Sequence, residues 1–186
     1  KTFVYKLVFK PVAPESGKKV NRKKRSDKPV QQPYKTFEGK TIRNIQIVTL
    51  DPFGYSVSDT GVPPQKFLAK AGNSLHIKTQ GITIRNLMLI HKNDPFNSLL
   101  VKESERLIRS QKYIHEVSFY AKSAGEKSDS VDIFIRELDK WSIIPKGSFS
   151  SSSVRIDLTD NNFMGTGHEF QNVFRSNSTT GFNSFN

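Results

Sequence analysis

The sequence predicts an α+β fold, with helices on one face of a small three-stranded sheet, followed by an antiparallel hairpin. Three observations predict it. Stretches of β-type alternation flank a region of helical spacing, in the order strand, helices, strand, strand. Residues 142–186 then change in composition and hold 19 Ser, Thr or Asn and six Phe. The first 40 residues hold most of the net positive charge, +9 of +12. We therefore divide the chain into a basic segment (1–40), a globular domain (41–140) and a carboxyl-terminal sheet (141–186).

The amino-terminal segment carries 12 Lys or Arg against 3 acidic residues. Blocks of like charge next to proline rarely fold, so one interpretation of residues 18–28 is a solvated linker. The other is an arm that binds phosphate head groups or nucleic acid. Aromatic neighbours that would stack on bases are sparse, so we expect no nucleic acid. Six residues would contact the anionic groups: Lys18, Lys19, Arg22, Lys23, Lys24 and Arg25.

The globular domain begins with a predicted strand over 41–50, which is rich in β-branched residues. A short helix follows, with Phe67 and Leu68 on one face, and Gly72-Asn73 is predicted to end it because both residues tolerate positive φ. A second helix is expected over Thr79–Ile90.

A third helix is predicted over Ser98–Ser110, with Leu100, Ser104, Leu107 and Ile108 on its inner face. Two strands come next, Ile114–Tyr120 and Val131–Arg136, joined by a polar hairpin loop. The order of these elements predicts a two-layer domain.

In the carboxyl-terminal sheet, Val154, Ile156 and Leu158 alternate with Arg155 and Asp157. One apolar and one polar face, with Gly-rich turns, fits a hairpin of a transmembrane β-barrel. The periodicity alone fits a soluble antiparallel sheet equally well.

Several classes of function find no support in the sequence. Cysteine is absent, which excludes disulfides, thiolate metal sites and cysteine nucleophiles. The four histidines lack metalloprotease spacing, and the serine run at 150–153 lacks the glycines of a nucleophile elbow. We therefore expect no catalytic activity, no metal and no cofactor.

Two motifs carry a family resemblance. The first is Asn93-Asp94-Pro95-Phe96 leading into the helix at 100–110, and the second is the turn at 160–168. Together they resemble the BamA/TamA superfamily of outer-membrane proteins, in which periplasmic POTRA domains precede a β-barrel. The segments 39–45 and 50–55 resemble its Bacteroidetes-like variety. The resemblance implies a POTRA-type β-α-α-β-β domain over 41–140 and the first two barrel strands over 141–186. Because a barrel needs at least about eight strands, we expect a fragment of a longer protein.

The same resemblance implies an outer-membrane assembly or translocation factor with its POTRA domain in the periplasm. Its partners would be unfolded outer-membrane or exported proteins, accessory periplasmic or lipoprotein subunits, and the outer membrane. Clients would pair with the exposed edge strand of the POTRA sheet by β-augmentation. The residues of this predicted edge are Ile114, His115, Glu116, Val117, Ser118, Phe119 and Tyr120. A capped or solvated edge is the alternative.

A second site is implied at the first barrel strand, expected over Ser150–Asp160, which would form one side of a seam that opens laterally. Its residues are Val154, Arg155, Ile156, Asp157 and Leu158, with the apolar members facing lipid and the charged ones facing the lumen. Trp141 would be an interfacial anchor or a buried residue of the junction. The alternative function is a basic module that binds anionic lipid or nucleic acid through residues 18–28. A purely structural role, with the domain docking accessory lipoproteins, is also open.

Overall fold

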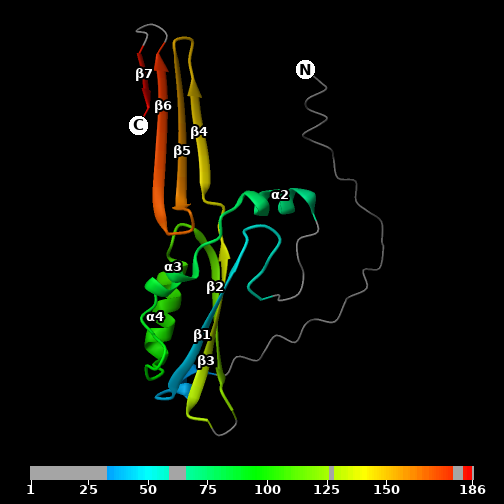
Figure 1. Ribbon diagram of the computed structural model, residues 1–186, viewed down its shortest axis with the longest axis vertical. Coiled ribbons are helices and arrows are strands. Elements are labelled where there is room, and N and C mark those ends of the chain that lie inside the picture. The colour runs from blue at the N-terminus through cyan, green and yellow to red at the C-terminus, as the bar shows by residue number, and fades with distance from the viewer. Residues whose placement is uncertain (1–32, 59–65, 126–127, 178–181, 186) are drawn as a thin grey trace, which may run out of the picture.

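The computed structural model describes residues 33–58, 66–125, 128–177 and 182–185. Figure 1 shows two sheets arranged end to end, with helices α3 and α4 against the first sheet and α2 beside the point where the chain passes to the second. The basic contacts expected at Lys18, Lys19, Arg22, Lys23, Lys24 and Arg25 lie outside the described residues. None of the helices in the described ranges is long and apolar enough to cross a bilayer.

The first sheet is built from β1 (Thr41–Leu50), β2 (Ile114–Ser123) and β3 (Ser130–Asp139) in the order β1-β3-β2. β3 lies in the centre, parallel to β1 and antiparallel to β2. Its alternating residues Val131, Ile133 and Ile135 are at most 1% exposed. The predicted mixed α+β architecture is therefore confirmed, with β3 as the central strand.

The 3-10 turn η1 (Tyr34–Phe37) and the helices α3 (Gly81–Asn86) and α4 (Ser98–Arg109) pack on this sheet, whereas α2 (Phe67–Leu75) has no buried residue and lies beside the start of β4 (Figure 1). α4 begins where expected, because the side chain of Asn97 caps it by accepting hydrogen bonds from the backbone N–H groups of Leu99 and Leu100. Its buried residues are Val101, Ser104 and Ile108. The expectation for Leu100 is wrong, since that side chain is 38% exposed and Val101 fills the inner position.

Two helices differ from the prediction. α2 continues through Gly72 and Asn73, because the side chain of Asn73 exchanges hydrogen bonds with the backbone of Phe53. α3 is shorter than the predicted helix at 79–90, because the N–H group of Thr79 bonds to the carboxylate of Asp139. Tertiary hydrogen bonds override the predicted stop signal in α2 and the helical spacing before α3.

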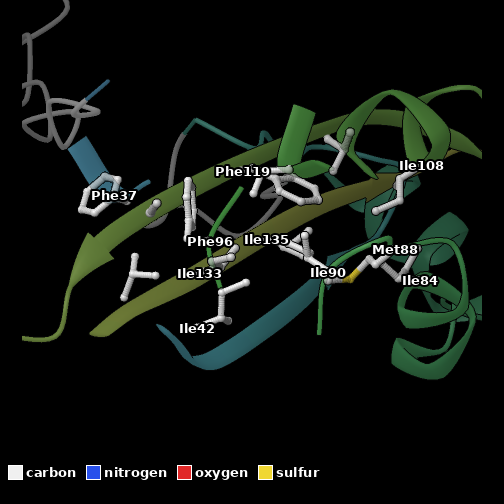
Figure 2. Packing of buried hydrophobic residues seen from close by; sticks show 14 of the residues in the cluster. Phe37, Ile42, Ile84, Met88, Ile90, Phe96, Ile108, Phe119, Ile133 and Ile135 are labelled. Atoms are coloured by element: carbon white, nitrogen blue, oxygen red, sulfur yellow. The ribbon is translucent and has the colours of Figure 1, made fainter. Parts of the chain in front are cut away.

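The larger of two hydrophobic clusters in the described residues lies between the sheet and the helices. Figure 2 shows Phe96 and Phe119 close to Ile133 and Ile135 of β3. Ile108 of α4 belongs to the same cluster. Each fully buried side chain of this size contributes roughly 1.5–3 kcal/mol. This core stabilises the sheet that contains β2, the predicted edge strand.

The second sheet is fully antiparallel and contains β4 (Ile143–Phe149), β5 (Ser153–Phe163), β6 (His168–Asn177) and β7 (Phe182–Phe185), in that order. The prediction of two strands is wrong, since the described residues form four. The strand expected first, at 150–160, is the second one. β4 escaped recognition because Pro145 and Gly147 are unfavourable in strand interiors.

Candidate functional site

The first candidate site is the outer side of β2, which has a strand neighbour, β3, on one side only among the described residues. The side chains of Ile114, Val117 and Phe119 are buried in the core, at 5%, 2% and 2% exposure. His115 and Glu116 are exposed, while Ser118 and Tyr120 are half-buried. A partner at this edge would therefore meet mainly backbone groups of the strand.

Two side chains cover part of this edge. Arg109 of α4 donates to the carbonyl of Val117 at 3.2 Å, and Tyr34 of η1 donates to the carbonyl of Phe119 at 3.2 Å. Because these carbonyls belong to residues two apart, they point to the same side of the strand. The edge is thus guarded by side chains, which can swing away, and not by a strand of the described chain.

The outer side of β1 is closed at its beginning by the segment that precedes α4. The N–H of Ile42 bonds to the carbonyl of Asp94 at 2.9 Å, and the N–H of Phe96 bonds to the carbonyl of Lys40 at 2.7 Å. The Asp-Pro-Phe turn therefore pairs with β1 as well as leading into α4. Asn93 enters the turn with φ +73°.

Further along, the outer side of β1 borders a cleft of about 470 Å³. The cleft is lined by Asn44–Ile47 of β1 and by Gly81, Ile82 and Arg85 of α3. The sequence analysis missed this place, because nothing in the local pattern shows which side of β1 lacks a strand neighbour.

The second sheet has two chemically different faces. Register places Pro145 beside Leu158, and Ile156 between Gly147 and Phe174, so apolar side chains share one face. The other face is polar and charged and carries Lys146, Ser148, Arg155, Asp157, Gln171 and Arg175.

The apolar face has no covering layer among the described residues. Five of its side chains are substantially exposed: Phe149 75%, Phe185 73%, Ile156 47%, Phe170 45% and Leu158 44%. Exposed apolar area on this scale marks an interaction surface for lipid or protein. Val154, also predicted for this face, is half-buried.

The predicted charged residues of the seam strand behave differently from each other. Arg155 is exposed, whereas Asp157 is 8% exposed and accepts two hydrogen bonds from the side-chain amide of Gln171, at 3.0 and 3.1 Å. Both nevertheless lie on the polar face, as expected.

The strand predicted to form a seam is not at an edge of the described sheet. Val154, Arg155, Ile156, Asp157 and Leu158 belong to β5, which pairs with β4 on one side and β6 on the other. The backbone N–H and C=O groups of these residues therefore already pair with β4 and β6. Among the described strands of this sheet, the edge before β5 is β4. A seam at this end of the sheet would be formed by β4.

A chain of buried hydrogen bonds joins the two sheets. Asp139, the last residue of β3, is 1% exposed and accepts from the backbone N–H of Thr79 at 2.9 Å and from its hydroxyl. Nε2 of His76 lies 2.8 Å from the same carboxylate. The Thr79 hydroxyl also accepts from the side-chain amide of Asn162 in β5, at 2.8 Å. Because the groups satisfy one another inside the protein, they hold the sheets in one orientation.

The turn between β5 and β6 reinforces this junction. The carbonyl of Gly165 accepts from the N–H of Gln80 and the hydroxyl of Thr83, both at 2.9 Å. Gly165 has φ +74°, and a Cβ there would lie 2.2 Å from the carbonyl oxygen of Lys78. Gly167, with φ +77°, is enclosed in the same way. The glycines of the predicted turn therefore serve close docking against the first domain as well as chain reversal.

A buried carboxyl group lies next to the junction. Glu137 of β3 is 0% exposed, and neither carboxylate oxygen has a hydrogen-bond partner within the described residues. Burial first, and then the charge of Asp139, raise the pKa of Glu137 to about 10, so this carboxyl is protonated at neutral pH. No sequence signal separates this residue from an ordinary exposed glutamate of a strand.

Trp141 lies at the junction, half-buried between Phe53 and His76, with ring centroids 5.7 and 6.3 Å away. Its indole N–H donates to the carbonyl of Ile143 at 2.6 Å. No cluster of three or more potential metal-ligating residues occurs in the described part of the chain.

Comparisons with known proteins give structural likeness but no match in sequence. No protein-family model matches the sequence, and no curated protein matches it. Among solved structures, BamA from Haemophilus ducreyi lacking POTRA domains 1–3 is similar, with a TM-score of 0.49 and 17% sequence identity. The similarity covers 75% of this chain and 22% of that chain.

Proposed function

We propose that this chain is part of an outer-membrane assembly or translocation factor. In this proposal the three-stranded domain is a POTRA-type module in the periplasm that receives unfolded outer-membrane or exported proteins. The four-stranded sheet is part of a β-barrel to which the client passes for insertion or export. Docking of accessory periplasmic or lipoprotein subunits belongs to the same proposal, and no chemical reaction is required.

One observation carries the membrane part of the proposal: the uncovered apolar face of the second sheet. A sheet in water buries its apolar face against another layer. Here Phe149, Ile156 and Leu158 stay 44–75% exposed on one face, while the opposite face is charged. A lipid-facing exterior and a polar interior require this division of side chains.

The client-binding part rests on the geometry of β2. An extended polypeptide that adds to a strand edge gains main-chain hydrogen bonds that do not depend on its sequence. β2 can offer such an edge once the side chains of Tyr34 and Arg109 release the carbonyls they occupy. While Tyr34 and Arg109 occupy these carbonyls, they hinder pairing of the β2 edge with other copies of the chain.

The junction supports transfer between the two parts. Thr79 accepts a hydrogen bond from Asn162 of β5, and the N–H of Gln80 donates to Gly165 in the β5–β6 turn, so the first domain is fixed against the end of the second sheet. A client on β2 would therefore be held at a defined position relative to the sheet.

Photo-crosslinking tests the proposal. A photoreactive amino acid replaces Ser118 on β2, and a matched variant carries it in place of Leu99, which is 71% exposed on α4. An unfolded outer-membrane protein should crosslink from position 118 and not from position 99. The yield should persist at moderate salt, whereas binding through the basic segment would fall steeply. Equal crosslinking from both positions, or loss at moderate salt, would contradict client capture at β2.

A further inference from the structure

Helix α2 exposes an apolar stripe that nothing in the described chain covers. No residue of the helix is buried. Phe67 and Leu68 are each 81% exposed, Leu75 is 70% exposed, and Ile77 just beyond the helix is 56% exposed. Phe67 and Leu75 lie eight residues apart and Leu68 lies beside them on the helical surface, so these side chains form one face.

Gly72 and Asn73 attach α2 to Phe53. Gly72 packs so closely on the ring of Phe53 that a Cβ would lie 2.7 Å from it. Asn73 donates to the carbonyl of Phe53 at 2.9 Å and accepts from its N–H at 3.1 Å. With α2 attached at these residues, Phe67, Leu68 and Leu75 remain exposed.

Positive charge surrounds the stripe. Lys66 precedes the helix, Lys70 lies within it, and Lys78 follows Ile77; all three are exposed. Lys78 pairs with Asp51, whose side chain is largely buried. Apolar side chains flanked by lysines suit the boundary of a bilayer with anionic head groups, because the ammonium groups reach phosphates while the apolar groups enter the acyl region.

The position of α2 fits the same boundary. Figure 1 shows the helix beside the beginning of β4, with its axis running across the direction of the strands of the second sheet. Trp141, two residues before β4, shares a shallow apolar hollow with Phe53 and Leu68. Aromatic side chains of this kind concentrate at membrane interfaces.

We propose that α2 lies flat in the head-group layer of an anionic bilayer, with Phe67, Leu68 and Leu75 entering the acyl boundary. The inference rests on the proposed function, because it takes β4–β7 to stand in the same membrane. The helix then fixes the depth and tilt of the first domain beneath the sheet.

Fluorescence of Trp141, the only tryptophan, gives a direct test. The 186-residue chain is mixed with phosphatidylcholine vesicles, with or without phosphatidylglycerol, that carry bromine at shallow or deep acyl positions. We expect a blue shift and quenching by the shallow bromines, both stronger with phosphatidylglycerol. The double variant Phe67→Ser with Leu68→Ser should partition at least about tenfold more weakly. Leu99→Ser, which removes an equally exposed side chain from α4, should bind like the unchanged chain.

A second double variant separates this inference from the proposed function. Ile156→Ser with Leu158→Ser alters the apolar face of the sheet and should weaken binding while leaving shallow quenching of Trp141 in the bound fraction. If the α2 variant binds as tightly as the unchanged chain while the sheet variant is weakened, the helix inference is overturned and the proposed function stands. If the α2 variant is weakened and the sheet variant is not, the membrane role of the sheet is contradicted.

Discussion

Replacement of Gly165 by alanine tests the docking of the two sheets. The residue has φ +74°, a conformation that costs an L-residue with a side chain about 1–2 kcal/mol. The new Cβ would also lie 2.2 Å from the carbonyl oxygen of Lys78, so the turn must move away. That movement breaks the hydrogen bonds that Gln80 and Thr83 donate to the Gly165 carbonyl.

The expected loss can be worked out from these contacts. Two hydrogen bonds contribute about 1 kcal/mol each, so with the backbone term Gly165→Ala should destabilise the fold by about 3–4 kcal/mol. Gly39→Ala is the matched control, because Gly39 has φ +78° but nothing within 4 Å of a new Cβ. It should cost about 1–2 kcal/mol, the backbone term alone.

Urea unfolding followed by the fluorescence of Trp141, which lies at the junction, measures both values. The difference between the two variants isolates the lost docking. Equal destabilisation by Gly165→Ala and Gly39→Ala would refute the claim that the β5–β6 turn is locked against the first domain.

Three further predictions concern the β2 edge, the buried carboxyl and the β4 pairing. Tyr34→Phe combined with Arg109→Ala should free two carbonyls of β2 and strengthen binding of an extended client peptide by roughly three- to tenfold, measured by fluorescence anisotropy. Glu137→Gln should flatten the pH dependence of stability: the unfolded chain loses this proton near the ordinary pKa, while the fold keeps it to about pH 10. As pH rises from the ordinary pKa of a glutamate to about 10, the free energy of unfolding of the unchanged chain therefore falls by at most about 1.4 kcal/mol per pH unit. Ser148→Cys with Arg155→Cys should form a disulfide on mild oxidation, because these residues face each other across β4 and β5.

Each of these predictions has a control and a contrary result. Arg106→Ala removes a surface ion pair with Glu103 and should leave peptide binding unchanged; an equal gain there would contradict the guarding role. If the stability of Glu137→Gln falls with rising pH as steeply as that of the unchanged chain, groups other than Glu137 cause the fall. Ser148→Cys with Arg175→Cys should stay reduced because Arg155 stands between them, so rapid oxidation would contradict the strand order.

Periodicity was sufficient to place the three strands of the first sheet along the chain, but not their order in the sheet. β-branched alternation marked β1 and β3, and the polar loop between β2 and β3 indicated their hairpin. β4 was missed because Pro145 removes a donor and Gly147 removes a side chain, which together hide an edge strand that tolerates both. The strand predicted to be the first of this sheet is therefore its second.

The contacts that matter most for the candidate sites are long-range, and local patterns do not record them. Arg109 and Tyr34 reach the β2 carbonyls from two different elements. Gly165 was interpreted as turn chemistry, whereas its carbonyl and its missing Cβ both serve a contact with Gln80 and Lys78. Such roles depend on which surfaces meet in three dimensions.

A scan with N-methylated client peptides tests most directly whether β2 captures polypeptide through main-chain hydrogen bonds. Each peptide carries one methyl group on one backbone nitrogen, which removes one donor and leaves the side chains unchanged. Along a strand, successive N–H groups point to opposite sides. The account predicts that methylation at every second residue abolishes binding and that methylation at the residues between has little effect. Uniform tolerance, or losses that follow particular side chains instead of this alternation, would contradict it.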